Sequence, residues 1–148
     1  MKHDMRTQAL SGVAASLLLT ASAFLPWLSL GDARLMGVPD PAGYFVAAMG
    51  VVGLGLSGAA WRGRRGTVQM LLLAGLAGLT TLTVVTMTGP STIADRALAH
   101  AEAVALVDNV AMQPPPAVHL AYGLVLGLLA SLAMAGVGLR AYLAAPDA

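Results

Sequence analysis

Four long stretches of the chain carry no charged residue. They cover about residues 9–30, 41–61, 67–88 and 117–139. Crossing the hydrocarbon core of a bilayer, about 30 Å thick, takes about 20 apolar residues in a helix. Apolar residues occur on every side of each stretch, which is typical of helices that have lipid on one side and other helices on the other. The pattern therefore predicts four transmembrane helices that run up, down, up and down.

Residues that start or stop helices lie at the ends of these stretches. Asp40, followed by proline, is typical of a helix N-cap, and Gly31 is suited to closing the first helix. Gly89-Pro90 is expected to stop the third helix, and the three prolines at 114–116 favour an extended polyproline approach to the fourth. Pro26 lies inside the first stretch, where it should kink the helix or end it early.

The longest segment between the predicted spans also has helical character. Thr92 followed by Asp95 resembles a capping box, and the sequence to Asp108 contains no helix breaker. We expect a weakly amphipathic external helix at about residues 92–108 that lies on the bilayer, caps the bundle or docks a partner. The predicted fold class is all-α: one membrane domain covering residues 1–148, a transmembrane four-helix bundle with one extra extramembrane helix between spans three and four.

Charge is distributed unequally between the two ends of the predicted bundle. Six of the eight Lys and Arg residues lie on one side of the predicted membrane, and only Arg34 and Arg96 lie on the other. Positive charge in short loops stays cytoplasmic, which predicts a multi-pass protein of the cell (plasma or inner) membrane with both termini in the cytoplasm. The six topology-determining residues are Lys2, Arg6, Arg62, Arg64, Arg65 and Arg140.

The first span has a second interpretation. Lys2 and Arg6, the apolar run and then Ala21-Ser22-Ala23 resemble a signal peptide with a cleavage site. Cleavage there would leave three spans. The apolar run continues beyond that point through Trp27, which favours an uncleaved span.

Aromatic residues with polar tips collect at membrane interfaces. In this chain they lie near the ends of the predicted spans and are expected to anchor them at the two interfaces. These residues are Trp27, Tyr44, Trp61, Tyr122 and Tyr142.

Helices in lipid associate by close packing, which small residues allow. Small residues repeat at a spacing of four in three of the spans, and we predict that they form helix contacts. They are Gly12, Ser16 and Thr20; Gly43, Ala47, Gly55 and Ala59; and Gly123, Gly127, Ser131 and Ala135. The last set serves either packing within the bundle or a homodimer. The threonines of the third span either line a pore or bond to the carbonyls of their own helix.

The composition excludes several kinds of site. The chain has no cysteine, a net charge of +1 and 10% charged residues. Disulfides and thiolate chemistry are absent, and no basic stripe predicts a nucleic-acid partner. His100 and Glu102 are two residues apart on a helix and point to different faces, so a metal site that also uses His119 is disfavoured. No catalytic, cofactor or metal residue is predicted, and the chain is not expected to be an enzyme.

Two short motifs carry a resemblance. Leu25-Pro26-Trp27 at the outer end of the first span, Arg62-Gly63-Arg64-Arg65 between spans two and three, and the Gly/Ala-rich spans resemble small bacterial four-span integral membrane proteins. The resemblance implies the architecture and transfers no functional residue. The leading hypothesis is a non-catalytic accessory or structural subunit whose partners are the lipid bilayer and either a larger membrane complex or copies of itself. Alternatives are a small oligomeric channel or transport accessory, and a membrane-bound metal-binding protein or enzyme.

Overall fold

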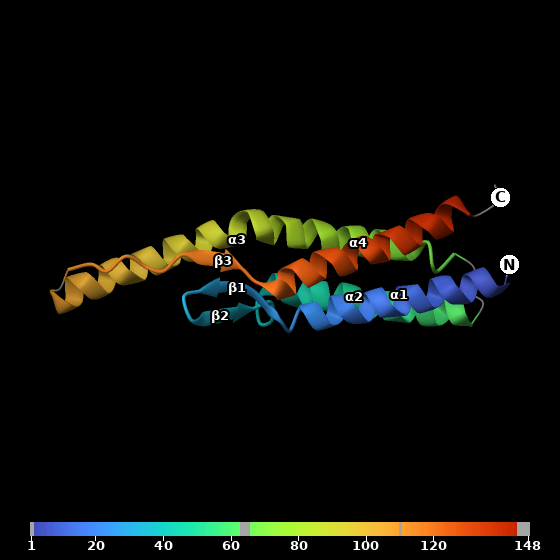
Figure 1. The fold of residues 1–148 in the computed structure, drawn as a ribbon, viewed down its shortest axis with the longest axis horizontal. Coiled ribbons are helices and arrows are strands. Elements are labelled where there is room, and N and C mark those ends of the chain that lie inside the picture. Colours follow the sequence, from blue (N-terminus) through green and yellow to red (C-terminus); the bar gives the residue numbers. More distant parts are fainter. Residues whose placement is uncertain (1, 63–65, 110, 145–148) are drawn as a thin grey trace.

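Helices dominate the architecture. The computed structural model describes residues 2–62, 66–109 and 111–144, and within them the helices are α1 (Lys2–Ser22), α2 (Pro41–Trp61), α3 (Met70–Asp108) and α4 (Tyr122–Leu143). α1 packs against α2 and α4, and α3 packs against the same two helices, so the four form a closed ring. The N- and C-terminal ends lie at the same end of the bundle (Figure 1).

Three of the helices, α2, α3 and α4, are long and apolar enough to cross a membrane. Three of the four expected segments therefore form helices with the length and composition that a membrane crossing requires. α2 has the range expected from the sequence, and its N-cap is confirmed: the Asp40 carboxylate accepts a 2.8 Å hydrogen bond from the backbone N–H of Ala42. α1 begins with a polar segment that contains Lys2, Asp4 and Arg6, so only its second half is continuously apolar.

A small antiparallel sheet corrects the all-α prediction. It contains β1 (Pro26–Leu30), β2 (Ala33–Met36) and β3 (Val118–Leu120) in the order β2-β1-β3. The predicted range 9–30 for the first span is wrong at its end, because α1 stops at Ser22. Proline lacks the N–H that a helix interior needs, so Pro26 prevents α1 from continuing. Gly31, with a φ of +58°, supplies the left-handed residue of a two-residue hairpin loop instead of a helix cap.

β3 also shortens the fourth helix at its start. The predicted range began at residue 117, whereas α4 begins at Tyr122. Val118 pairs with Leu30, and the backbone N–H of Ala121 donates a 2.8 Å hydrogen bond to the carbonyl of Trp27. The strand β1 therefore lies between two hydrogen-bonded neighbours and joins the ends of α1, α2 and α4.

Trp27 is buried within this junction. Only 3% of its surface is exposed, and its indole Nε1 donates a 2.8 Å hydrogen bond to the carbonyl of Ser22. Gly37 lies against the indole so closely that no Cβ would fit. The prediction of Trp27 as an interface anchor is therefore wrong: the ring closes the end of the bundle.

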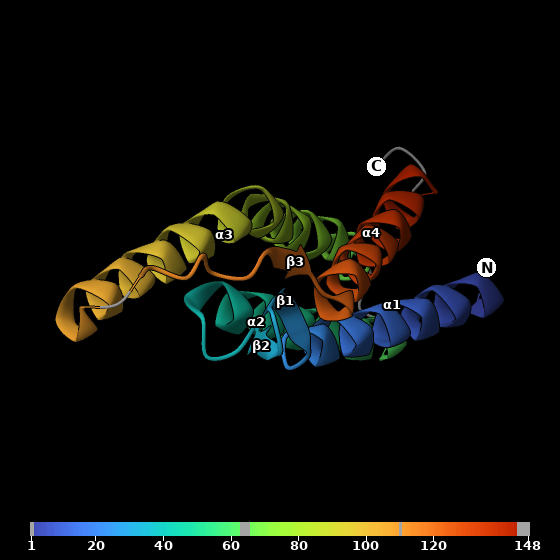
Figure 2. The ribbon, with the colours of Figure 1, turned by 60° about the vertical axis from the view of Figure 1, so that its left-hand side comes forward.

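α3 corrects the prediction of a separate external helix. The sequence predicted a stop at Gly89-Pro90 and a new helix at 92–108. Instead α3 runs without interruption through Pro90 and is 39 residues long in total. The helix bends in its middle part (Figure 2), as expected where a proline removes one backbone hydrogen bond. Side-chain hydroxyls lie at this bend, where Ser91 and Thr92 donate to the carbonyl of Thr88, and Thr92 also donates to that of Gly89. Hydroxyls that bond back to carbonyls of their own helix often accompany a bend.

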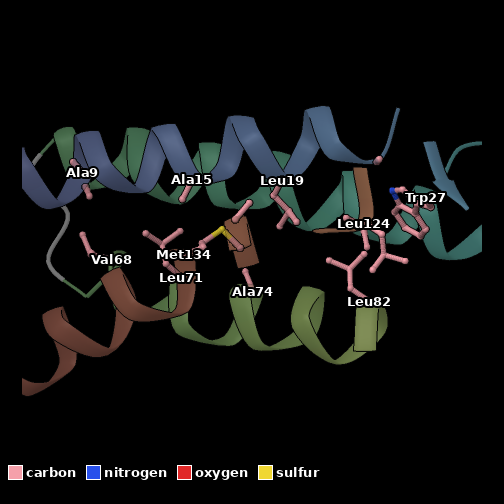
Figure 3. Close-up of a cluster of buried hydrophobic side chains, with 14 of the residues drawn as sticks. Ala9, Ala15, Leu19, Trp27, Val68, Leu71, Ala74, Leu82, Leu124 and Met134 are labelled. Atoms are coloured by element: carbon pink, nitrogen blue, oxygen red, sulfur yellow. The ribbon is translucent and has the colours of Figure 1, made fainter. Parts of the chain in front are cut away.

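Large apolar side chains from three of the helices fill the core of the bundle, beside four buried serines. Leu19, Leu71, Leu82, Leu124 and Met134 are fully buried, and Figure 3 shows them converging between the helices.

Candidate functional site

α1 and α2 meet along a seam of glycines and hydroxyl side chains. A Cβ added at Gly12 would lie 2.5 Å from Ser57 Oγ, and one added at Gly53 would collide with Ser16 Oγ. Further along, Gly50 faces Thr20 in the same way. Residue numbers rise on one helix as they fall on the other, so the two helices are antiparallel. Gly12, Ser16 and Thr20 thus all lie at a helix contact.

The small-residue stripe on α4 is buried within the chain. A Cβ at Gly123 would lie 2.5 Å from the carbonyl oxygen of Pro26, and one at Gly127 would lie 2.9 Å from Ser22 Oγ. Ser131 and Ala135 are also buried, and both lie against glycines of α3. The stripe is therefore occupied by contacts inside the bundle, as the first of its two interpretations expected.

On α2 the predicted stripe and the actual seam differ. Gly43 is buried against the carbonyl of Gly37, and Ala47 packs at the edge of the core. Gly55 faces open space, however, and Ala59 is only half-buried. Four residues advance a helix by about 40° more than a full turn, so a stripe with spacing four drifts round to the outside. The buried positions instead alternate between spacings of three and four: Gly43, Val46, Gly50, Gly53, Ser57 and Ala60.

The other predicted anchors are exposed. Tyr44 and Tyr122 lie near the starts of α2 and α4, and Trp61 and Tyr142 lie at or near the opposite ends of the same helices. All four present more than half of their surface. This placement leaves them free to meet a membrane interface.

The predicted topology residues that are described lie at the end of the bundle opposite the sheet. The side chains of Arg6, Arg62 and Arg140 are exposed there. Lys2 starts α1 at the same end. Arg64 and Arg65 lie outside the described residues.

The polar groups that suggested a pore are engaged within α3. Thr80, Thr81 and Thr83 each donate a hydrogen bond to the carbonyl four residues earlier, at 2.8, 3.0 and 2.8 Å. Thr86 and Thr88 do the same. This confirms the second interpretation of these threonines, which is bonding to their own helix.

The residues considered for metal binding do not form a cluster. His100 is exposed on α3, whereas His119 belongs to β3 and pairs with Ser29. Among the described residues, no three His, Asp or Glu side chains are placed to hold a metal ion.

The most distinctive feature is a projecting arm, defined as the part of α3 after Gly89 together with the returning segment 111–117. The two pieces run side by side beyond the sheet in both views (Figures 1 and 2). One face of the helix is half-buried, at Ile93, Ala97, Ala101 and Ala105. Asn109 ends the helix with a φ of +51°, and its N–H donates to the carbonyl of Ala105. Asn at this position is a known stop signal that the sequence interpretation did not use.

The rest of the arm is uncovered. Leu106 and Val107 are 82% and 84% exposed, and three further apolar side chains of the arm are also exposed: Leu98, Val104 and Met112. Two shallow hollows lie along the arm. One is lined by Glu102, Ala105, Leu106, Asn109 and Met112, and the other by His100, Ala101, Val104, Ala105, Ala111 and Gln113.

Comparisons of the chain with models of known families, with curated proteins and with solved structures find no match. The bundle and the arm are therefore the features from which a function has to be argued.

Proposed function

We propose that the chain is a non-catalytic subunit of a larger membrane complex, held in the bilayer by four helices and joined to its partner through the arm. The fourth crossing helix would be α1. It closes the ring of helices between α2 and α4, and Leu10, Leu17 and Leu18 on its surface are exposed. Lipid would cover these side chains, as it would cover those on the outer faces of the other helices.

The exposed aromatic residues support this placement. With a rise of about 1.5 Å per residue, Tyr44 and Trp61 lie about 26 Å apart along α2, and Tyr122 and Tyr142 about 30 Å apart along α4. These spacings match the thickness of the hydrocarbon core, about 30 Å. The exposed Arg6, Arg62 and Arg140 would then lie on the cytoplasmic side, with both termini.

The arm is the observation that carries the proposed role. At 39 residues, α3 is about 58 Å long, almost twice the thickness of the hydrocarbon. Its second half leaves the bundle and continues beyond the sheet (Figure 1), so in this placement it projects away from the bilayer. There Leu106 and Val107 remain almost fully exposed. Apolar side chains exposed together in this way mark interaction sites, and a partner protein would cover them.

Site-specific crosslinking tests the proposal. A photoreactive phenylalanine analogue at position 106 should give a covalent adduct with another protein in native membranes. The same analogue at Leu129, which is exposed on the membrane part of α4, is the control and should give no protein adduct. An adduct with the chain itself would assign the arm to self-association, and the absence of any adduct at both 106 and 107 would contradict the proposal.

A pair of charge variants gives a second readout. Leu106→Glu places a charge in the proposed interface, whereas Leu143→Glu places one on an equally exposed residue at the far end of α4. The first change should reduce co-purification of the partner by about tenfold or more, because an interface cannot desolvate an unpaired carboxylate cheaply. The second should leave it unchanged.

A further inference from the structure

A notch lies on the outer surface of α2, near the end opposite the sheet. It is lined by Gly55, Gly58, Ala59 and Arg62. A Cβ added at Gly55 or Gly58 would meet no atom within 4 Å. These two glycines therefore serve no contact inside the bundle, unlike Gly50 and Gly53 on the inner face of the same helix.

The notch combines the exposed backbone of two glycines with a cation at one end. The Arg62 side chain is exposed beside it, and Trp61, also exposed, precedes it in the chain. Five acidic residues lie away from it: Asp32 and Asp40 at the sheet end, and Asp95, Glu102 and Asp108 on the arm, whereas Asp4 of α1 lies at the same end of the bundle as Arg62. Because the Arg62 side chain is exposed, an anion from outside the chain can reach its guanidinium.

We propose that this notch binds one anionic phospholipid, with an acyl chain against Gly55 and Gly58 and the headgroup phosphate on Arg62. This inference rests on the membrane placement proposed above, which puts Arg62 at the cytoplasmic interface. A guanidinium forms paired hydrogen bonds to a phosphate, and basic residues at the membrane surface attract anionic lipids. The absence of side chains at the two glycines leaves room for part of a hydrocarbon chain to lie against the helix backbone.

Charge argues against a second copy of the chain as the occupant. Copies in one membrane share the same orientation, so a symmetric contact through this notch would bring the two Arg62 side chains together at the same depth. Like charges oppose such a contact, whereas an anionic lipid complements the positive charge of Arg62.

Lipid titration followed by native mass spectrometry tests the inference on the purified full-length chain. Phosphatidylglycerol and phosphatidylcholine with identical acyl chains are the two probes. We expect the first phosphatidylglycerol to bind about fivefold more tightly than phosphatidylcholine, a preference that corresponds to one basic residue at a membrane surface. Arg62→Gln should remove the preference, and millimolar inorganic phosphate should not compete.

A matched pair of glycine variants separates the notch from charge alone. Gly58→Leu fills the notch, whereas Gly136→Leu adds the same side chain at an equally open site on α4. Only the first should weaken the binding of phosphatidylglycerol. Equal binding of the two lipids, competition by phosphate, or unchanged binding by Gly58→Leu would each overturn the inference. So would a change from dimer to monomer in Gly58→Leu, which would assign the notch to a second copy.

The outcome of the lipid-binding test does not depend on the partner protein. The lipid test uses the chain alone, so loss of the crosslinks at position 106 would leave it intact. Failure of the chain to insert into lipid nanodiscs would instead contradict the membrane placement that both proposals share.

Discussion

At the scale of single residues, the glycines of this chain fall into two classes that the sequence does not distinguish. Gly75 lies against the backbone of α4, where an added Cβ would be 2.5 Å from the nitrogen of Ala135. Gly136 lies on a helix of similar composition but faces open space. Backbone atoms cannot move aside as a flexible side chain can, so a methyl group should have opposite effects at the two sites.

We therefore expect Gly75→Ala to lower the free energy of unfolding by about 1–3 kcal/mol, the usual cost of overpacking. Gly136→Ala should leave it unchanged or raise it by up to about 1 kcal/mol, because alanine favours the helix. Unfolding of the detergent-solubilised protein by increasing amounts of SDS, followed by circular dichroism, measures both. Equal stability of the two variants would contradict the close approach of α3 to α4.

The same distinction limits what could be predicted at this scale. Small residues at spacing four coincide with the buried stripe of α4 from Gly123 to Ala135, whereas Gly55 on α2 faces open space. Burial depends on where the neighbouring helices lie, which the spacing of small residues does not reveal. Trp27 was misplaced for a related reason: its position near the end of an apolar run is typical of an interface anchor, whereas the junction that β1 forms with β2 and the distant β3 buries it.

At the scale of elements, the bend in α3 sets the direction of the arm. Pro90 cannot donate to the carbonyl of residue 86, and its ring crowds that carbonyl. The sequence predicted a complete stop here because glycine and proline are each unfavourable in the interior of a helix. The helix nevertheless continues to Asp108, because Pro90 removes only one backbone hydrogen bond, the one to the carbonyl of Thr86.

Pro90→Ala should straighten α3. Restoring the N–H removes the cause of the bend, and relief of a kink of about 20° or more would move position 107 by roughly 9 Å, since it lies about 26 Å beyond the proline. Spin labels on Leu35→Cys and Val107→Cys report this movement as a shift in their distance distribution. Leu98→Ala, at an exposed position on the arm, retains the proline and the hydroxyls and serves as the control. An unchanged distribution in Pro90→Ala would mean that the bend has another cause.

At the scale of the whole molecule, the sequence predicted the helices better than their connections. Long uncharged stretches identify spans because lipid imposes one strong requirement, that every backbone group be bonded internally. The sheet escaped prediction because its strands are three to five residues long and β3 lies far from β1 in sequence. The arm was recognised as a helix, but its union with the third span depends on the local bonding at Pro90.

The orientation of the molecule in the membrane is open to a direct test, because the chain has no cysteine. Single substitutions Val107→Cys on the arm and Leu143→Cys near the end of α4 place one thiol at each end of the molecule, both at strongly exposed positions. In sealed right-side-out vesicles, a membrane-impermeant maleimide should label the arm thiol at once and the α4 thiol only after permeabilisation. The reason is the unequal charge of the two ends: Arg6, Arg62 and Arg140 lie with the termini, and positive charge is retained in the cytoplasm. Labelling of both thiols before permeabilisation would place the two ends on one side and contradict a crossing by α4, whereas the reverse order would invert the proposed orientation and place the arm in the cytoplasm.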